Sequence, residues 1–307
     1  MTNQLSIRDL RGILLPFTTP FDERGEVHTK GIQLNIAKWN KTGIRGYVAL
    51  GSTGERVHLD EREYSEVIET ARREVSDDLA FIVGAGQQST VGTINEIKKA
   101  AHAGADAVLV ITPHFYRAAI THDALVRHYT EVADASPVPV MLYSMPALTG
   151  VKIEPETIAR LSQHPNVIGV KDSSADTEGL KRTYELCPDQ FAVLTGNGTV
   201  LREALLAGAC GGILAVGCAV PEICVEIFRA VQADEQNRAI TLQNKLTPLA
   251  VAVTTRFGIG GLKAALDMRG FTGGTVRAPL QPADEGARAE IAGLLEEALI
   301  HSVALAR

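Results

Sequence analysis

The feature that most constrains this chain is an alternation of short apolar runs with segments of helical periodicity, repeated eight times. The runs are hydrophobic along their whole length rather than at every second residue, which is typical of parallel strands covered on both faces. Behind each run, apolar residues recur at the spacing of one helix face. The runs occupy residues 12–17, 46–50, 80–83, 107–111, 138–142, 167–170, 191–194 and 212–216.

Eight such units predict an α/β fold, a closed (β/α)8 TIM barrel. An open, doubly wound sheet is the alternative that the alternation leaves open. From about residue 236 onward the pattern is wholly helical, with glycine and proline at the joints. We therefore expect a barrel catalytic domain over residues 1–232 and a C-terminal helical domain over residues 233–307, which offers a surface for an oligomer.

Charge and composition limit the partners and the compartment. The formal net charge of -6 and the isoelectric point near 5.8 argue against nucleic acid or an anionic membrane as the main partner. No apolar run approaches the ~18 residues of a membrane span, and residues 1–11 lack the apolar segment of a secretory signal. The four cysteines form no C-x-x-C pair, so we expect reduced thiols and a cytoplasmic location.

Metal and nucleotide chemistry find little support in the sequence. The histidines between residues 102 and 128 have no metal-ligand spacing, so we expect no metal. Residues 84–86, Gly-Ala-Gly, lack the third glycine of a dinucleotide-binding turn, and there is no P-loop. Gly196 and Asn197, before Gly198, are interpreted as a tight turn after the seventh run, with a substrate contact as the alternative.

Polar residues at the ends of three runs are the candidates for chemistry, because barrels of this kind carry their active sites at the carboxyl ends of the strands. Lys171 ends the sixth run. It is either a solvated or ion-paired lysine, the commoner case, or an amine whose pKa is lowered by desolvation so that it attacks a carbonyl. Tyr143 ends the fifth run, and its ordinary interpretation is a core tyrosine with a satisfied hydroxyl.

A third candidate group follows the second run. Ser52 and Thr53, flanked by Gly51 and Gly54, can form a small cradle for a carboxylate, although an ordinary glycine-rich turn has the same composition. The cradle, the phenol and the lysine converge on one rim. Together they predict a site for a 2-oxo acid, in which the cradle holds the carboxylate, the lysine attacks the adjacent carbonyl and the phenol moves protons.

Three stretches also carry a family resemblance. Residues 51–55 (Gly-Ser-Thr-Gly-Glu), 143–146 (Tyr-Ser-Met-Pro) and 169–172 (Gly-Val-Lys-Asp) resemble the signatures of the dihydrodipicolinate synthase / N-acetylneuraminate lyase superfamily. The resemblance runs over essentially the whole chain. It implies a barrel with a C-terminal helical part, assembled as a homo-oligomer (tetramer or dimer), and catalysis through a Schiff base with pyruvate or a pyruvate-derived donor.

The resemblance also assigns roles to residues. It implies that Lys171 forms the imine, that Tyr143 shuttles protons with help from Ser52, and that Ser52 and Thr53 bind the carboxylate beside Gly54. No cofactor is implied beyond the covalent imine itself. Within the superfamily the chain looks most like 4-hydroxy-2-oxoglutarate aldolase, at stretches that belong mainly to the scaffold: residues 142–146, 161–166, 255–259 and 277–280.

The chain departs from the family patterns where the second substrate would bind. Leu148 stands where dihydrodipicolinate synthases place an arginine for the second carboxylate. The acidic residues with which sialic acid lyases hold sugar hydroxyls have no match at residues 196–199. Phe115 aligns with a family tyrosine that reaches into a neighbouring subunit's site, and Tyr116 beside it is the candidate substitute.

The sequence therefore predicts a class I, Schiff-base-forming aldolase that cleaves 4-hydroxy-2-oxoglutarate to pyruvate and glyoxylate, or runs that reaction in reverse. The alternatives are 4-hydroxy-tetrahydrodipicolinate synthase and an aldolase for 2-keto-3-deoxy sugar acids. A non-catalytic keto-acid-binding protein is the alternative from another class, and Phe115 is the residue that motivates it.

Overall fold

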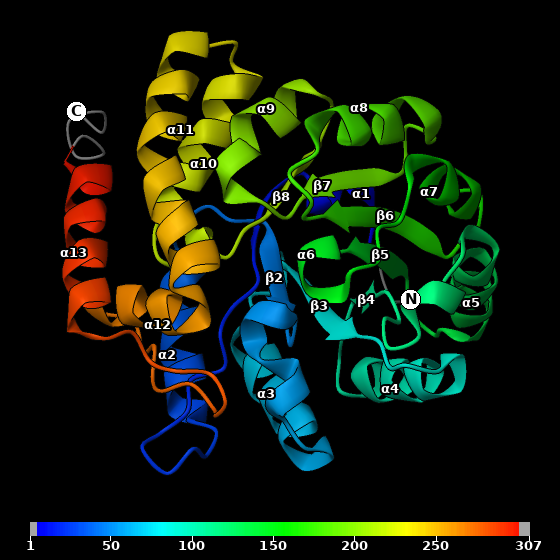
Figure 1. The fold of residues 1–307 in the computed structure, drawn as a ribbon, viewed down its shortest axis with the longest axis horizontal. Helices are drawn as coiled ribbons and strands as arrows, with labels where there is room; N and C mark the ends of the chain where they lie inside the picture. The colour runs from blue at the N-terminus through cyan, green and yellow to red at the C-terminus, as the bar shows by residue number, and fades with distance from the viewer. Residues whose placement is uncertain (1–4, 301–307) are drawn as a thin grey trace.

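The computed structural model describes residues 5–300 and contains a closed barrel of eight parallel strands in sequence order (Figure 1). The ring closes because β1 (Gly12–Leu15) pairs with both β2 (Gly46–Ala49) and β8 (Gly211–Ile213). This closure confirms the predicted (β/α)8 barrel and excludes the open sheet. The remaining strands are β3 (Ala80–Ala85), β4 (Ala107–Ile111), β5 (Val140–Ser144), β6 (Val167–Asp172) and β7 (Ala192–Thr195).

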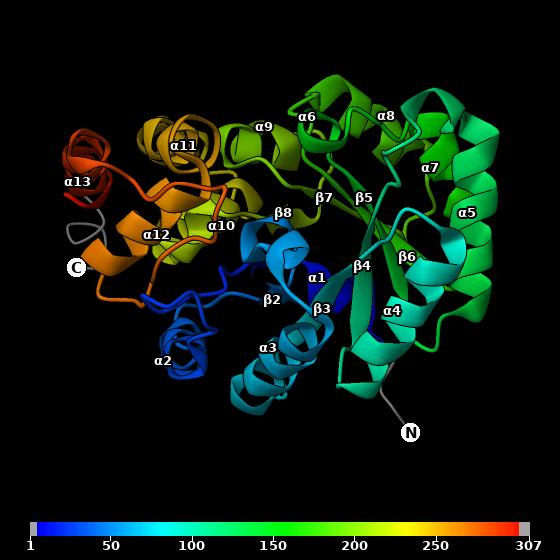
Figure 2. The same cartoon turned by 60° about the horizontal axis from the view of Figure 1, so that its bottom comes forward.

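Helices follow the strands and cover the outside of the barrel (Figure 2). Each presents an apolar face to the strands, so the outer core lies between the sheet and this layer of helices. The helices of the barrel are α2 (Thr29–Trp39), α3 (Glu61–Glu74), α4 (Thr90–His102), α5 (His122–Ala135), α7 (Pro155–Leu161), α8 (Thr177–Leu186), α9 (Leu201–Leu206) and α10 (Pro221–Gln232), with the short α6 (Pro146–Thr149) after β5.

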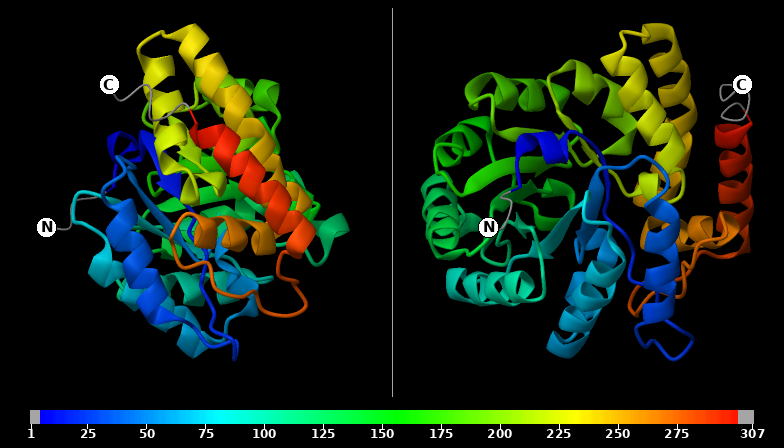
Figure 3. Two further views of the ribbon diagram at one scale, coloured as in Figure 1. Left: turned by 90° about the vertical axis from the view of Figure 1, so that its left-hand side faces the viewer. Right: turned by 180° about the vertical axis from the view of Figure 1, so that it is seen from behind.

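A second, smaller core fills the inside of the barrel. Leu14, Ile82, Leu109 and Met141 are at most 1% exposed and pack against one another across the ring. Leu10 of α1 (Ile7–Leu10) joins the same cluster and closes the end of the barrel from which the strands start (Figure 3). With that end plugged, the carboxyl ends of the strands are left to form a site.

Most strands differ from their predicted bounds by one to three residues, and the differences at β5 and β6 place the candidate residues. β5 begins at Val140, two residues later than predicted, because Pro139 has no N–H to donate and only its carbonyl accepts a hydrogen bond, from the Val108 N–H at 2.9 Å. Both β5 and β6 extend beyond their apolar runs, since Tyr143 pairs with Lys171 and Ser144 with Asp172. The two candidate side chains are therefore fixed by a strand ladder, not by a loop.

The C-terminal residues are helical, as predicted, and pack against the barrel. α11 (Gln236–Val251) runs along α10 and begins at residue 236, where the helical pattern of the sequence begins. α12 (Gly258–Met268) and α13 (Glu285–Leu299) complete this layer on one side of the barrel (Figure 1). Residues 301–307 of the predicted helical domain lie outside the described residues. The outer core is continuous from the barrel into these helices, and the division at residue 232 stays a prediction. Between residues 5 and 300 we find no helix with the length and apolarity to cross a membrane.

Candidate active site

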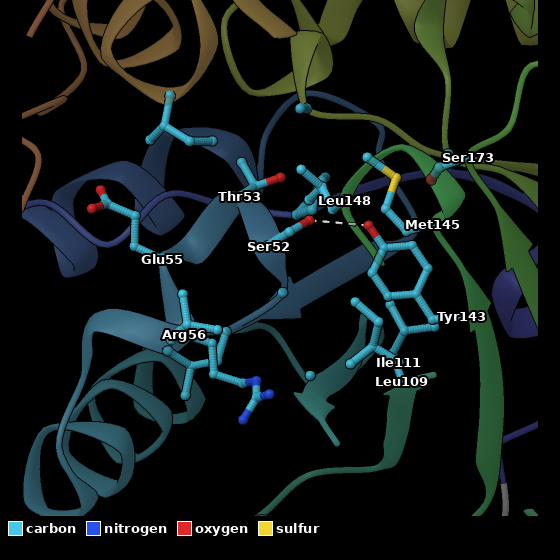
Figure 4. A pocket seen from close by; sticks show the side chains of 18 of the residues that line it. Ser52, Thr53, Glu55, Arg56, Leu109, Ile111, Tyr143, Met145, Leu148 and Ser173 are labelled. Atoms are coloured by element: carbon cyan, nitrogen blue, oxygen red, sulfur yellow. Dashed lines mark hydrogen bonds between the residues drawn. The ribbon is translucent and has the colours of Figure 1, made fainter. Parts of the chain in front are cut away.

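A cavity of about 530 Å³ opens at the carboxyl ends of the strands. Lys171 from β6, Tyr143 from β5 and Ser52 from the loop after β2 line it together. Figure 4 shows Tyr143 and Ser52 facing each other across it. The structure thus brings to one place the three groups that the sequence placed on one rim.

Lys171 is buried and has no ionic partner within residues 5–300. The residue is 3% exposed, and its Nζ lies 4.3 Å from the centroid of the Tyr143 ring, whose face favours a cation. No carboxylate among residues 5–300 pairs with it. The neighbouring Asp172 points elsewhere, where its carboxylate accepts a hydrogen bond from the Ser174 N–H at 2.7 Å. The structure therefore rules out both ordinary interpretations of Lys171, the solvated strand end and the ion pair.

Tyr143 turns its hydroxyl to the loop after β2. The Tyr143 Oη and Ser52 Oγ atoms hydrogen-bond at 3.0 Å, and the phenol is 3% exposed. In Figure 4 the hydroxyls of Ser52 and Thr53 face the side of the loop on which Tyr143 lies. A proton can therefore move along a continuous path between Ser52 and the phenol beside the lysine.

The loop that carries Ser52 and Thr53 is held in a strained conformation. Leu50 and Glu55, on either side of it, both have a φ of 55°, a left-handed conformation that non-glycine residues rarely adopt. Gly84 on β3 permits it, because a Cβ at that position would lie 2.7 Å from the Leu50 carbonyl carbon. Such strain persists only where the surroundings fix it.

Buried ionic contacts fix the far end of this loop. The Glu55 carboxylate, 1% exposed, pairs with Lys263 Nζ at 2.6 Å. It also accepts a hydrogen bond from the Arg277 backbone N–H at 3.1 Å and lies 3.0 Å from His58 Nδ1. Burial lowers the pKa of Lys263, while the adjacent Glu55 acts to raise it. These contacts anchor the Ser52–Thr53 loop to α12 and to the segment after it.

Gly196 lines the cavity at a position where no larger residue fits. A Cβ at this position would lie 2.7 Å from Lys171 Cε and would also collide with the Ser173 hydroxyl. The glycine therefore leaves room for the lysine side chain to reach the cavity. This close approach is the reason for Gly196, rather than a tight turn alone.

Three predicted site residues do not line the cavity of their own chain, and six do. The Asn197 side chain caps the next turn instead, accepting from the Thr199 N–H at 2.9 Å, so the tight-turn interpretation describes it. The Gly54 carbonyl accepts from the Thr19 hydroxyl at 2.8 Å, behind the loop. Tyr116 is 72% exposed and packs on Phe115 outside the cavity. The predicted residues that do line it are Ser52, Thr53, Tyr143, Leu148, Lys171 and Gly196.

Sequence reasoning missed two groups. Ser173, two positions after Lys171, also lines the cavity. The Glu55–Lys263 pair was not anticipated, although a lysine within the apolar stretch of residues 262–266 was a signal for a buried charge with a distant partner.

A buried lysine beside a phenol and a hydroxyl pair, at the carboxyl rim of a (β/α)8 barrel, is the arrangement that a Schiff-base lyase requires. Comparison with known proteins gives the family. Residues 9–298 match the Dihydrodipicolinate synthetase family, and the chain belongs to that family.

Individual relatives agree with this assignment. A 4-hydroxy-tetrahydrodipicolinate synthase of Methanothrix thermoacetophila is 33% identical over 286 residues, which cover 93% of this chain and 96% of the relative. The crystal structure of dihydrodipicolinate synthase from Thermotoga maritima superposes with a TM-score of 0.90 at 30% identity, covering 94% of this chain and 98% of that one. The enzyme from Acinetobacter baumannii, complexed with pyruvate, gives 0.87 at 30% identity, with the same coverage.

Family membership makes the chain a lyase of the Schiff-base, pyruvate-using class, which needs no external cofactor. The non-catalytic alternative is therefore set aside. The relatives are named as 4-hydroxy-tetrahydrodipicolinate synthases, not as 4-hydroxy-2-oxoglutarate aldolases. These names favour 4-hydroxy-tetrahydrodipicolinate synthase, an alternative in the sequence analysis, over its main prediction, 4-hydroxy-2-oxoglutarate aldolase.

Proposed function

We propose that this chain is a class I pyruvate aldolase in which Lys171 forms the imine. The observation that carries the proposal is the buried Lys171 amine, which no carboxylate among the described residues neutralises, at 4.3 Å from the centroid of the Tyr143 ring. Burying an amine without a partner lowers the stability of the fold, so its presence here favours a functional role for it. Pyruvate gives it a carbonyl to attack and brings a negative charge close to it.

Each neighbouring group has a part in the proposed mechanism. Ser52 and Thr53 hold the pyruvate carboxylate and so orient its ketone toward Lys171. The amine attacks the ketone and water leaves, which gives a protonated imine that withdraws electrons from C3. Tyr143, hydrogen-bonded to Ser52, carries protons to and from the reacting oxygen and carbon.

Two finer functions differ in the acceptor that meets the pyruvate carbon. The names of the relatives support 4-hydroxy-tetrahydrodipicolinate synthase. The resemblance of scaffold stretches supports 4-hydroxy-2-oxoglutarate aldolase. Both reactions use an acceptor that bears a carboxylate, whereas Leu148 on the cavity wall cannot bind one. The pyruvate half of the reaction is common to all of these possibilities.

Borohydride reduction in the presence of pyruvate tests the proposal. The intact mass should increase by one reduced pyruvate adduct, and peptide mapping should place it on Lys171, because reduction makes the imine irreversible. Borohydride without pyruvate is the control and should leave the mass unchanged. An unchanged mass with saturating pyruvate would contradict the proposal.

We also propose that the chain assembles as a homodimer or homotetramer. Phe115 and Tyr116 form an edge-to-face pair and expose 74% and 72% of their surface, unusual for adjacent large aromatic residues on a monomer. Sedimentation analysis should give the mass of two or four chains, and Phe115→Ser with Tyr116→Ser should shift it toward one. A monomeric wild-type protein at micromolar concentration would rule this assembly out.

A further inference from the structure

The cavity has a polar inner end. Ser52, Thr53 and Ser173 lie there with Tyr143 and Lys171, and all of them line the cavity. Within the described residues, the Thr53 and Ser173 hydroxyls have no hydrogen-bond partner, and Ser52 bonds only to Tyr143. These groups are therefore free to bind a ligand, and their number suits a single carboxylate and ketone.

The outer end offers no such free group among its polar side chains. Thr149 Oγ1 donates to the Met145 carbonyl at 3.0 Å, and Thr254 Oγ1 donates to the Ala250 carbonyl at 2.6 Å. Both hydroxyls are thus committed to the backbone of their own helical turns. Neither can donate to a substrate without giving up a bond that it already makes.

The other basic side chains that line the cavity, besides Lys171, are committed as well. Arg56 pairs with Glu96 at 2.5 Å and also donates to the Gly86 carbonyl. His58 lies 3.0 Å from the Glu55 carboxylate. His114 keeps its Nδ1 3.2 Å from the Thr112 carbonyl and its Nε2 3.4 Å from Gln88 Nε2. A second carboxylate in the cavity would therefore find these three basic side chains already paired or hydrogen-bonded, and would lose its water shell without replacement from them.

What remains at the outer end is an apolar wall. Leu148 and Leu280 stand at the mouth, where they are 63% and 38% exposed, while Val253 is fully buried behind them. Large aliphatic side chains exposed around a cavity mouth are a recognised mark of a ligand-binding surface. The wall is made by Met145, Leu148, Val253, Ile259 and Leu280.

We propose that the acceptor of this lyase is an uncharged, apolar aldehyde, bound against this wall. The inference rests on the proposed function, since it assigns only the second substrate. The imine loses a C3 proton to become an enamine, and C3 then bonds to the aldehyde carbon while the aldehyde oxygen takes up a proton. Water releases a 4-hydroxy-2-oxo acid with an apolar group on C4, and cleavage follows the same steps in reverse.

Matched pairs of aldehydes test the assignment on the wild-type enzyme. Benzaldehyde is compared with 4-carboxybenzaldehyde, and butanal with succinic semialdehyde, each with pyruvate and with product measured by mass spectrometry. Glyoxylate and aspartate 4-semialdehyde are included as the acceptors of the two finer functions. We expect kcat/KM to be at least about tenfold higher for the uncharged member of each pair, the size of effect that one pocket contact can produce.

Leu148→Arg adds a second measurement, because it supplies the missing cation at the outer end. The variant should move the preference within each pair toward the carboxylate by about tenfold or more. Equal or faster turnover of the carboxylate members by the wild type would overturn the inference, as would a trapped pyruvate imine with no uncharged aldehyde accepted. Absence of the imine itself is a separate result, which would overturn the proposed function and the acceptor with it.

Discussion

Replacing Lys171 with methionine should abolish turnover and the borohydride-trapped pyruvate adduct together. Methionine keeps the unbranched aliphatic stem that lies against Gly196 but removes the amine. Without a nucleophile no imine forms, so nothing withdraws electrons from the pyruvate carbon and the C–C bond cannot be made or broken. We expect kcat to fall on the order of 10⁴-fold or more, as when other enzymes lose their nucleophile.

The same substitution at Lys152 is the matched control. This lysine is partly exposed and paired with Asp176 at 3.0 Å, away from the cavity. Lys152→Met should keep the adduct and the turnover. Thermal unfolding separates chemistry from folding, because Lys171→Met removes a buried amine that has no ionic partner among the described residues and should not lower the melting temperature. An adduct of unchanged yield in Lys171→Met would place the imine on another lysine.

Tyr143→Phe should separate proton transfer from imine formation. The phenylalanine keeps the ring under Lys171 but loses the hydrogen bond to Ser52, so it removes proton transfer without removing the amine. Turnover should fall by roughly 10²-fold or more, the usual contribution of a positioned acid–base group. The pyruvate adduct should still form, though more slowly.

The sequence predicted the barrel and the position of the candidate site because both follow from local pattern. Short runs that are apolar throughout are typical of parallel strands buried on both faces. Polar residues that end such strands lie together at the carboxyl rim of the barrel. Lys171 and Tyr143 were found in this way. The strand bounds were wrong by two residues at the end of β5 and of β6, since hydrophobicity stops at the first polar side chain while the backbone ladder continues.

The sequence could not predict which polar groups already make hydrogen bonds within the scaffold and so are not available to a substrate. Gly54 and Asn197 were expected in the site from their neighbourhood. Gly54 instead accepts a hydrogen bond from the distant Thr19, and Asn197 caps the turn at Thr199. Composition does not determine which groups the folded chain already hydrogen-bonds. The pairing of Glu55 with Lys263 was equally out of reach, because it joins the loop after β2 to α12.

That pairing should make Lys263 one of the most sensitive positions for stability. Lys263→Met leaves the Glu55 carboxylate, 1% exposed, without its ammonium partner, and its remaining contacts with the Arg277 N–H and the His58 ring do not replace that charge. Breaking a buried pair from one side costs about 3–5 kcal/mol. We expect chemical denaturation to show a loss of unfolding free energy in that range, together with a raised KM for pyruvate because the Ser52–Thr53 loop loses its anchor.

A surface lysine provides the scale for this measurement. Lys181 faces Glu185 at 4.0 Å with both side chains more than half exposed, and Lys181→Met should cost no more than about 1 kcal/mol. The double variant Lys263→Met with Glu55→Gln should recover part of the loss, because it removes the stranded charge while keeping an acceptor for Arg277. If Lys263→Met costs as little as Lys181→Met, the buried pair does not hold the loop. The strained φ angles of Leu50 and Glu55 would then have to be stabilised by packing against β3 alone.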